Sequence, residues 1–144
     1  MKAFRTERTG RKNAAFSGVG SSKWGGHWNS KGRRVIYCSE SRALSMLELL
    51  VHLLEPELVE GQFVWTIEFD ESMIYTPQSI PIGWDSDAHS LAASSIRDAW
   101  IAAGKFAVMR VPSAVVREEF NYLFNPAHPD FARIEISTPI KIRH

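Results

Sequence analysis

The spacing of apolar and polar residues along the chain predicts five strands. Apolar and polar residues alternate over residues 63–69 (FVWTIEF), as in a strand with one buried face. Residues 106–111 (FAVMRV) are apolar apart from one arginine, which is typical of a buried strand. Shorter runs predict strands at residues 2–6, at 33–38, and at 133–142, the last interrupted by Pro139 because proline cannot complete a ladder.

Two segments have a helical pattern instead. Ser39 or Ser41 caps the first helix, which runs to about Leu54 and ends before Pro56. The second helix covers residues 90–103, followed by Gly104 as its C-terminal cap.

The segments between these elements predict loops and turns. Residues 10–26 and 76–87 are rich in Gly, Ser and Pro and predict long loops, and Lys31-Gly32 predicts a turn. Pro112-Ser113 opens a short helix or turn. Strands and helices are mixed without a repeated strand–helix–strand unit, so we expect one α+β domain spanning residues 1–144.

The first helix carries a polar stripe whose meaning the pattern leaves open. Ser41, Ser45, Glu48 and His52 are three or four residues apart and therefore share one face. Among amphipathic helices such a face is usually solvated, and the pattern alone favours that interpretation. The alternative is that the stripe lines a cleft, where Glu48 orients a hydroxyl or stabilises a developing positive charge.

Composition narrows the classes of function. The 144 residues include 17 basic and 16 acidic ones, for a net charge of +1, which predicts no general affinity for nucleic acid or membranes. A single cysteine, the lack of a signal-peptide pattern and the lack of an apolar run of about 18 residues predict a soluble cytoplasmic protein. The five tryptophans indicate either an aromatic cleft or core packing.

Several candidate sites are not supported by spacing. Glu48 and His52 lack the second histidine of a zinc-binding HExxH motif, and no other histidines stand at ligand spacing, so we expect no metal. Cys38 is expected to be buried, and Ser113 lacks the glycines of a nucleophile elbow. Tyr37 is more typical of core packing than of chemistry, and Asn125 before proline is typical of a turn. Asn121, between aromatic residues, is able to present its amide inward.

Three segments together resemble the RES domain, the toxin half of bacterial RES–Xre toxin–antitoxin pairs. They are Phe4-Arg5, GGHWNSKGRRVIYCSESRALSMLELLVHL and VPSAVVREEFNYLFNPAHPDF, in the order that the family has them. The family is similar to diphtheria-type ADP-ribosyltransferases. The resemblance therefore implies a split, strongly curved mixed β-sheet with a few flanking helices, and NAD⁺ as the substrate.

The resemblance also implies roles for particular residues. The family's catalytic glutamate falls on Glu48 and its tyrosine on Tyr37. Its first-strand arginine falls on Arg5, its cleft serine on Ser113 and its asparagine on Asn121.

One position departs from the family pattern. The family usually has arginine before Trp-Asn, but here His27 precedes Trp28. An imidazole offers one donor in place of the bidentate guanidinium fork, so the grip on the cofactor is expected to differ. His27, Tyr37 and Glu48 then form a His-Tyr-Glu set similar to that of diphtheria-type transferases, with Trp28 expected beside the cofactor.

The implied function is a toxin that cleaves the nicotinamide–ribose bond of NAD⁺ and transfers ADP-ribose to a protein target. The alternative is an NAD⁺ glycohydrolase or phosphorylase, with water or phosphate as the acceptor. A third interpretation is a nucleotide-binding module without catalysis. The resemblance further implies an Xre-like antitoxin that blocks the active site, for which Trp24 and Trp28 are candidate anchors.

Overall fold

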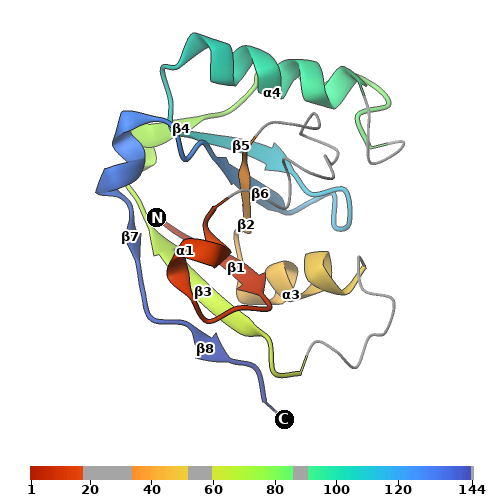
Figure 1. Ribbon diagram of the computed structural model, residues 1–144. Coiled ribbons are helices and arrows are strands. Elements are labelled where there is room, and N and C mark those ends of the chain that lie inside the picture. The colour runs from red at the N-terminus through yellow and green to blue at the C-terminus, as the bar shows by residue number, and fades with distance from the viewer. Residues whose placement is uncertain (18–33, 52–59, 86–90, 144) are drawn as a thin grey trace.

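The computed structural model describes residues 1–17, 34–51, 60–85 and 91–143 (Figure 1). These residues form a mixed eight-stranded sheet in the order β4-β5-β6-β2-β1-β3-β7, and β8 also pairs with β3. The strands are β1 (Lys2–Glu7), β2 (Ile36–Ser39), β3 (Phe63–Glu68), β4 (Ile74–Tyr75), β5 (Val108–Pro112), β6 (Phe120–Phe124), β7 (Glu135–Ile136) and β8 (Ile140–Lys141). The helices are α1 (Lys12–Ala15), α3 (Arg42–Leu50) and α4 (Leu91–Ala103), with 3₁₀ turns at Glu71–Met73 and Pro129–Arg133.

The sheet is split between β1 and β2. Phe4 and Ser39 form the one registered pair between these strands, whereas six pairs join β1 to β3 and four join β2 to β6. Where the two strands separate, the Arg5 side chain links them in place of a backbone hydrogen bond, because its Nη1 donates to the Tyr37 carbonyl oxygen at 2.8 Å. The result is a curled sheet of two halves, as expected from the resemblance.

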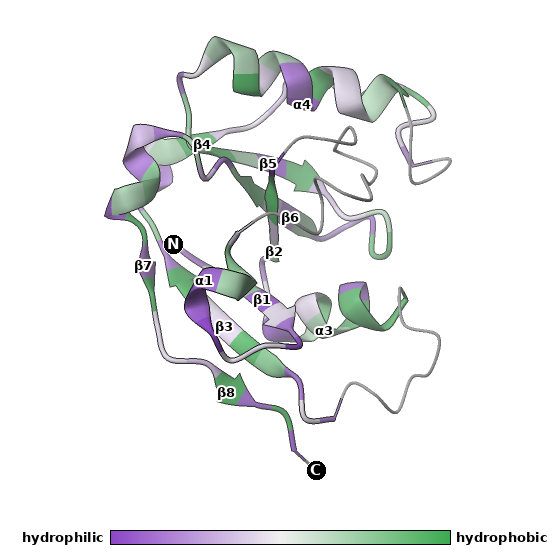
Figure 2. Cartoon of the chain, viewed as in Figure 1, coloured by the Kyte–Doolittle hydropathy of each residue, from purple (hydrophilic) through white to green (hydrophobic). Residues whose placement is uncertain are grey.

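Helix α4 packs on one face of the β5–β6 half (Figure 1). Trp100 and Ala93 of this helix contact a buried cluster that includes Met109, Val111 and Leu123 of the sheet. Both β5 and β6 are largely hydrophobic in Figure 2, as strands covered on both faces should be. Strands β4 and β5 are parallel and α4 connects them, so the fold contains one strand–helix–strand unit that the sequence pattern did not predict.

A second core lies on the other face of the sheet. Phe16 packs edge-on against Trp65 with ring centroids 5.4 Å apart, and Phe69 packs against Phe124 at 5.2 Å. Ile36 and Cys38 of β2 point into this core. Because side chains alternate along a strand, Tyr37 and Ser39 point to the opposite face, the face on which α4 packs.

The predicted strands at 2–6, 63–69 and 106–111 and both predicted helices are confirmed, with shifts of at most four residues at their described ends. Gly104 has the positive φ of +65° expected of a C-terminal cap. The predicted loop at 10–26 was wrong at its start, because residues 12–15 form α1, and the strands β4 and β6 were not predicted. The predicted turn at Lys31-Gly32 lies outside the described residues.

In the part of the chain that the structure describes, no helix combines the length and the hydropathy required to cross a bilayer.

Candidate active site

Helix α3 lies on β1 with its polar stripe turned toward the sheet. The Ser41 hydroxyl caps the helix by accepting a hydrogen bond from the Leu44 N–H at 3.0 Å. One turn later, Ser45 Oγ and Thr6 Oγ1 of β1 share a buried hydrogen bond of 2.7 Å. The solvated-face interpretation of the stripe was therefore wrong.

The apolar residues Leu47 and Val51, by contrast, are exposed, at 36% and 52% of their surface. The stripe faces inward because the sheet offers hydrogen-bond partners for its polar side chains.

Glu48 projects from α3 into a set of polar side chains at the ends of β5 and β6. Its Oε1 accepts two hydrogen bonds, from Ser113 Oγ at 2.6 Å and from Asn121 Nδ2 at 2.8 Å. Oε2 accepts no hydrogen bond from any residue that the structure describes. Glu48 is partly exposed, and two donors fix its Oε1.

The turn between β5 and β6 fixes the Ser113 hydroxyl. Ser113 is fully buried, and its N–H donates to the Glu119 carbonyl at 2.8 Å. Its Oγ accepts hydrogen bonds from the N–H groups of Val115 and Val116, each at 3.0 Å. A hydroxyl whose lone pairs are occupied in this way has its hydrogen left to donate, and that hydrogen goes to Glu48. The segment forms a turn, which is one of the two outcomes expected for Pro112-Ser113.

Asn121 is held from its other side by Ser39. The Ser39 hydroxyl donates to Asn121 Oδ1 at 2.8 Å, and the two residues are also cross-strand partners in the β2–β6 ladder. Sequence reasoning did not identify Ser39 as a site residue. The register of the sheet is the feature that identifies Ser39, because pairing of β6 with β2 places it directly opposite Asn121. Glu48, Ser113, Asn121 and Ser39 are called the Glu48 cluster below.

Tyr37 lies on the same face of β2 as Ser39, two residue pairs further along the ladder. It is half-buried and packs against the cluster of side chains beneath α4. The structure thus brings Tyr37 to the face of the sheet that carries the Glu48 cluster.

Arg5 is not brought to this cluster. Along β1, Thr6 faces α3, so Arg5 points to the opposite face of the sheet, beside α1. Its Nε donates to the Ala15 carbonyl at 2.9 Å, and its Nη2 forms an ion pair with Glu7 at 2.9 Å. Together with the bond to the Tyr37 carbonyl, these contacts engage all three guanidinium nitrogens in holding the fold together.

The remaining candidate residues lie in the core, in a turn or outside the described residues. Burial raises the pKa of the Cys38 thiol to about 12, opposed by the positive charge of Arg5, and the expectation of a buried cysteine is confirmed. Asn125 Oδ1 accepts from the Ala127 N–H at 3.0 Å, which is the turn expected there. Trp65 and Trp100 are core residues, which agrees with the core-packing interpretation for these two tryptophans. His27, Trp28, Trp24 and His52 lie outside the described residues.

Metal binding finds no support in the side chains whose positions are described, since no three His, Cys, Asp or Glu residues gather there. The chemistry that the Glu48 cluster offers is that of a fixed carboxylate. Such a group accepts a hydrogen bond from a hydroxyl and stabilises positive charge that develops nearby. A positioned acid that protonates a leaving group is not part of the cluster as described.

Comparison with known proteins places these features in a family. A model of the RES domain matches residues 2–143. A protein named Prs ADP-ribosylating toxin, from Sphingobium sp. (strain YBL2), is 37% identical over 120 residues, which cover 80% of this chain and 74% of that protein. A protein named Toxin Res, from Yersinia enterocolitica, is 34% identical over 120 residues, covering 82% and 79%.

A solved structure supports the fold. In the crystal structure of the M. tuberculosis MbcT–MbcA toxin–antitoxin complex, one chain superposes with a TM-score of 0.71 at 16% identity. The match covers 98% of this chain and 83% of that one. The split, curled sheet is therefore a known fold.

Proposed function

The chain belongs to the RES domain family, and from this premise we propose that it is the toxin of a bacterial type II toxin–antitoxin pair. In this proposal the toxin cleaves the nicotinamide–ribose bond of NAD⁺ and transfers the ADP-ribose to a protein. The observation that carries the proposal is the geometry of Glu48, whose Oε1 is fixed by two donors while Oε2 accepts no hydrogen bond from the described residues.

That geometry suits the bond to be broken. The nicotinamide ring of NAD⁺ is a positively charged pyridinium while it is bound to ribose. It departs as a neutral molecule when that bond breaks, so no acid has to protonate it. The ribose becomes oxocarbenium-like, and a carboxylate near its 2′-hydroxyl stabilises that charge by accepting a stronger hydrogen bond as the charge develops. Glu48 Oε2 fits this role because Ser113 and Asn121 prevent the carboxylate from turning away.

NAD⁺ binding is assigned to the residues around Glu48. Tyr37, on the same face of the sheet, fits a ring that stacks on nicotinamide. His27 and Trp28 are assigned to the cofactor, His27 through a hydrogen bond to ribose. Asn121 has a second amide hydrogen and is a candidate for contact with ribose. The Ser113 hydroxyl is buried and already engaged, so its proposed part in the cofactor site is to hold Glu48. Arg5 is the weakest of the assigned residues, because its guanidinium is already engaged.

Transfer to a protein is preferred over degradation because the relative from Sphingobium is named an ADP-ribosylating toxin. Water or phosphate as acceptor is the alternative, and it uses the same residues up to the departure of nicotinamide.

An antitoxin is proposed to cover the site in the resting cell, since free turnover of NAD⁺ in the cytoplasm would harm the host. The solved complex that shares this fold contains an antitoxin. Leu47 of α3 and Val51 at its C-terminal cap form an exposed apolar pair beside Glu48 in sequence, which is the kind of surface that a partner protein buries. An Xre-like protein is the expected partner.

The experiment is an incubation of the pure protein with adenine-labelled NAD⁺ and a cell lysate, with nicotinamide release and protein-bound label measured together. The proposal expects nicotinamide release with label on a discrete protein. Nicotinamide release with the label remaining on small molecules would favour degradation. The absence of nicotinamide release would contradict the proposal.

A further inference from the structure

We propose that Ser39 is a positioning residue that sets the orientation of Glu48 through Asn121. This inference rests on the proposed function for its kinetic consequences and on the described geometry for its structural part. Ser39 is buried and its hydroxyl donates to Asn121, so its effect on a substrate has to pass through another side chain.

The hydrogen bonds of the Glu48 cluster run in one consistent direction. An ionised carboxylate only accepts hydrogen bonds, so the amide of Asn121 has to turn its NH₂ group toward Glu48. Asn121 Oδ1 then points at Ser39, which has to donate its hydroxyl hydrogen. The direction of each bond therefore depends on the next one, and Ser39 holds the orientation of the amide from the far side.

Burial makes this dependence strong. Ser39 is 3% exposed and Asn121 is 7% exposed, so water has little access to replace a lost partner. Without the Ser39 hydroxyl, Asn121 Oδ1 loses a buried donor. The amide then gains by rotating toward any other donor, and Glu48 loses the N–H that fixes its Oε1.

The backbone around Ser39 explains why this position is suited to the task. Ser39 is the last residue of β2, paired with Asn121 of β6 on one side and with Phe4 of β1 on the other. The Phe4–Ser39 pair is the one registered contact between the two halves of the sheet. The Ser39 hydroxyl thus lies where the two halves of the sheet meet. Glu48 comes from α3, and the Ser45–Thr6 hydrogen bond attaches α3 to β1.

The test is a double-mutant cycle on Ser39→Ala and Asn121→Ala, with the thermal midpoint of each variant measured to confirm folding. In the parent background, Ser39→Ala should lower kcat for nicotinamide release roughly tenfold, the loss of one buried hydrogen bond, with KM changed less than about twofold. In the Asn121→Ala background, Ser39→Ala should change kcat less than about twofold, because the residue through which it acts is gone.

Ser94→Ala is the matched control, since Ser94 is also a buried serine (7% exposed) but its hydroxyl bonds within α4 to the Leu91 carbonyl. It should leave kcat within about twofold of the parent, which is within the effect expected of one remote hydroxyl. A parent-like kcat for a folded Ser39→Ala protein would overturn the inference. Equal factors in both backgrounds would do the same, since they would mean a general effect on the fold.

A second readout does not depend on activity. In the parent, the side-chain NH₂ of Asn121 should give an NMR signal that is slow to exchange with water, and Ser39→Ala should speed that exchange at least about tenfold, the same factor as above. An unchanged Asn121 signal would overturn the inference. A parent protein without nicotinamide release would contradict the proposed function alone, and the NMR comparison would still decide the role of Ser39.

Discussion

Cys38 lies between Tyr37 and Ser39 in β2, and its thiol points to the opposite face from the Glu48 cluster, into the core around Ile36 and Phe124. A cysteine so close in sequence to candidate catalytic residues invites a nucleophilic role. Burial argues against it, because a nucleophile has to be a thiolate and the pKa of this thiol is raised to about 12. Two adjacent residues on opposite faces of one strand therefore have unrelated chemistry.

The raised pKa predicts how stability depends on pH. Below the usual thiol pKa of 9.0, both folded and unfolded chains are protonated at Cys38, and the residue adds no pH dependence. Between pH 9 and 12 the unfolded chain loses this proton while the folded chain keeps it. The free energy of unfolding should then fall by up to about 1.4 kcal/mol per pH unit more in the parent than in a Cys38→Ala variant.

Urea unfolding at pH 8 to 10.5 of both proteins measures this difference. Other alkaline groups, including Tyr122, whose pKa is also raised by burial, are common to both proteins and cancel in the comparison. Parallel curves for the two proteins would show that Cys38 is not held protonated.

At the scale of elements, α3 is the element that delivers Glu48, and its first turn depends on Ser41. Ser41→Ala removes the acceptor for the Leu44 N–H and should lower the free energy of unfolding by about 1 kcal/mol, whereas Ser41→Asp should retain most of it. Chemical denaturation measures both. Ser95→Ala, which removes an exposed hydroxyl inside α4, is the control and should cost less than about 0.5 kcal/mol. Equal losses for Ser41→Ala and Ser41→Asp would argue against capping.

Elements with a clear apolar period were predictable from the sequence, and the others were not. The alternation in FVWTIEF identifies β3. Ser41 caps the start of α3, and Gly104 caps the end of α4. Strand β6 was not predicted because Asn-Pro, a turn signal, follows FNYLF directly, and because all but its first residue are buried, which removes the alternation. The two-residue strand β4 is stabilised by its partner β5 and has no signal of its own.

The same limit applied to the candidate site. The resemblance placed Glu48, Ser113 and Asn121 on the sequence, but their meeting depends on the register of β5, β6 and β2, to which no local pattern contributes. Ser39 became visible only through that register. The inward direction of the polar stripe of α3 likewise depends on Thr6, which lies 39 residues away from Ser45.

At the scale of the whole molecule, Arg5 connects the two halves of the split sheet. Its guanidinium joins β1 to the Tyr37 carbonyl of β2 and to α1 through the Ala15 carbonyl. Arg5→Met should therefore lower the free energy of unfolding by about 2 kcal/mol, the cost of losing hydrogen bonds from a charged donor. The KM for NAD⁺ should change less than about threefold, because the guanidinium is already engaged within the fold and Arg5 is the weakest of the residues assigned to NAD⁺.

Arg143→Met, at an exposed position near the C-terminus, is the charge-matched control and should leave both quantities near the parent values. If Arg5→Met raised KM about tenfold with unchanged stability, the family's assignment of this arginine to the cofactor would be favoured over the structural role.

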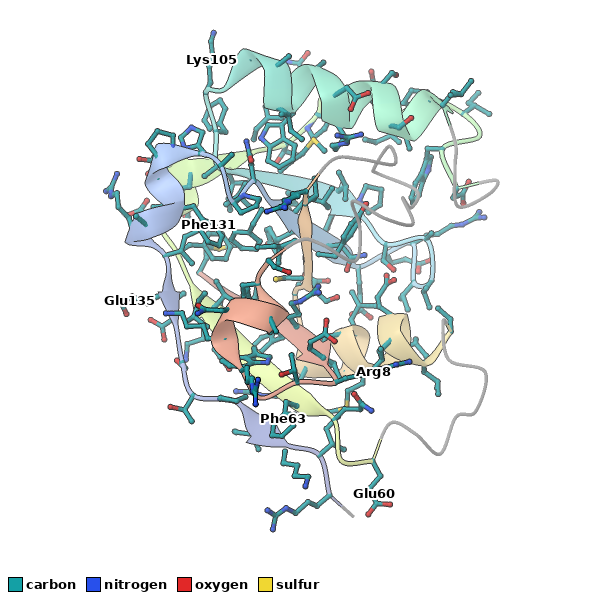
Figure 3. The ribbon with its side chains drawn as sticks, viewed as in Figure 1. Arg8, Glu60, Phe63, Lys105, Phe131 and Glu135 are labelled. Atoms are coloured by element: carbon teal, nitrogen blue, oxygen red, sulfur yellow. The ribbon has the colours of Figure 1, made fainter. Side chains whose placement is uncertain are left out.

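Glu48 is proposed to stabilise the transition state of nicotinamide–ribose cleavage, and the rate of nicotinamide release by three proteins tests this role. They are the parent, Glu48→Gln and the control Glu135→Gln, whose carboxylate is exposed on β7, far from α3 (Figure 3). Glu48→Gln keeps the shape of the side chain but removes its charge, so kcat should fall roughly 100- to 1000-fold with KM little changed. Glu135→Gln should release nicotinamide at the parent rate. A folded Glu48→Gln protein that does the same would contradict the account.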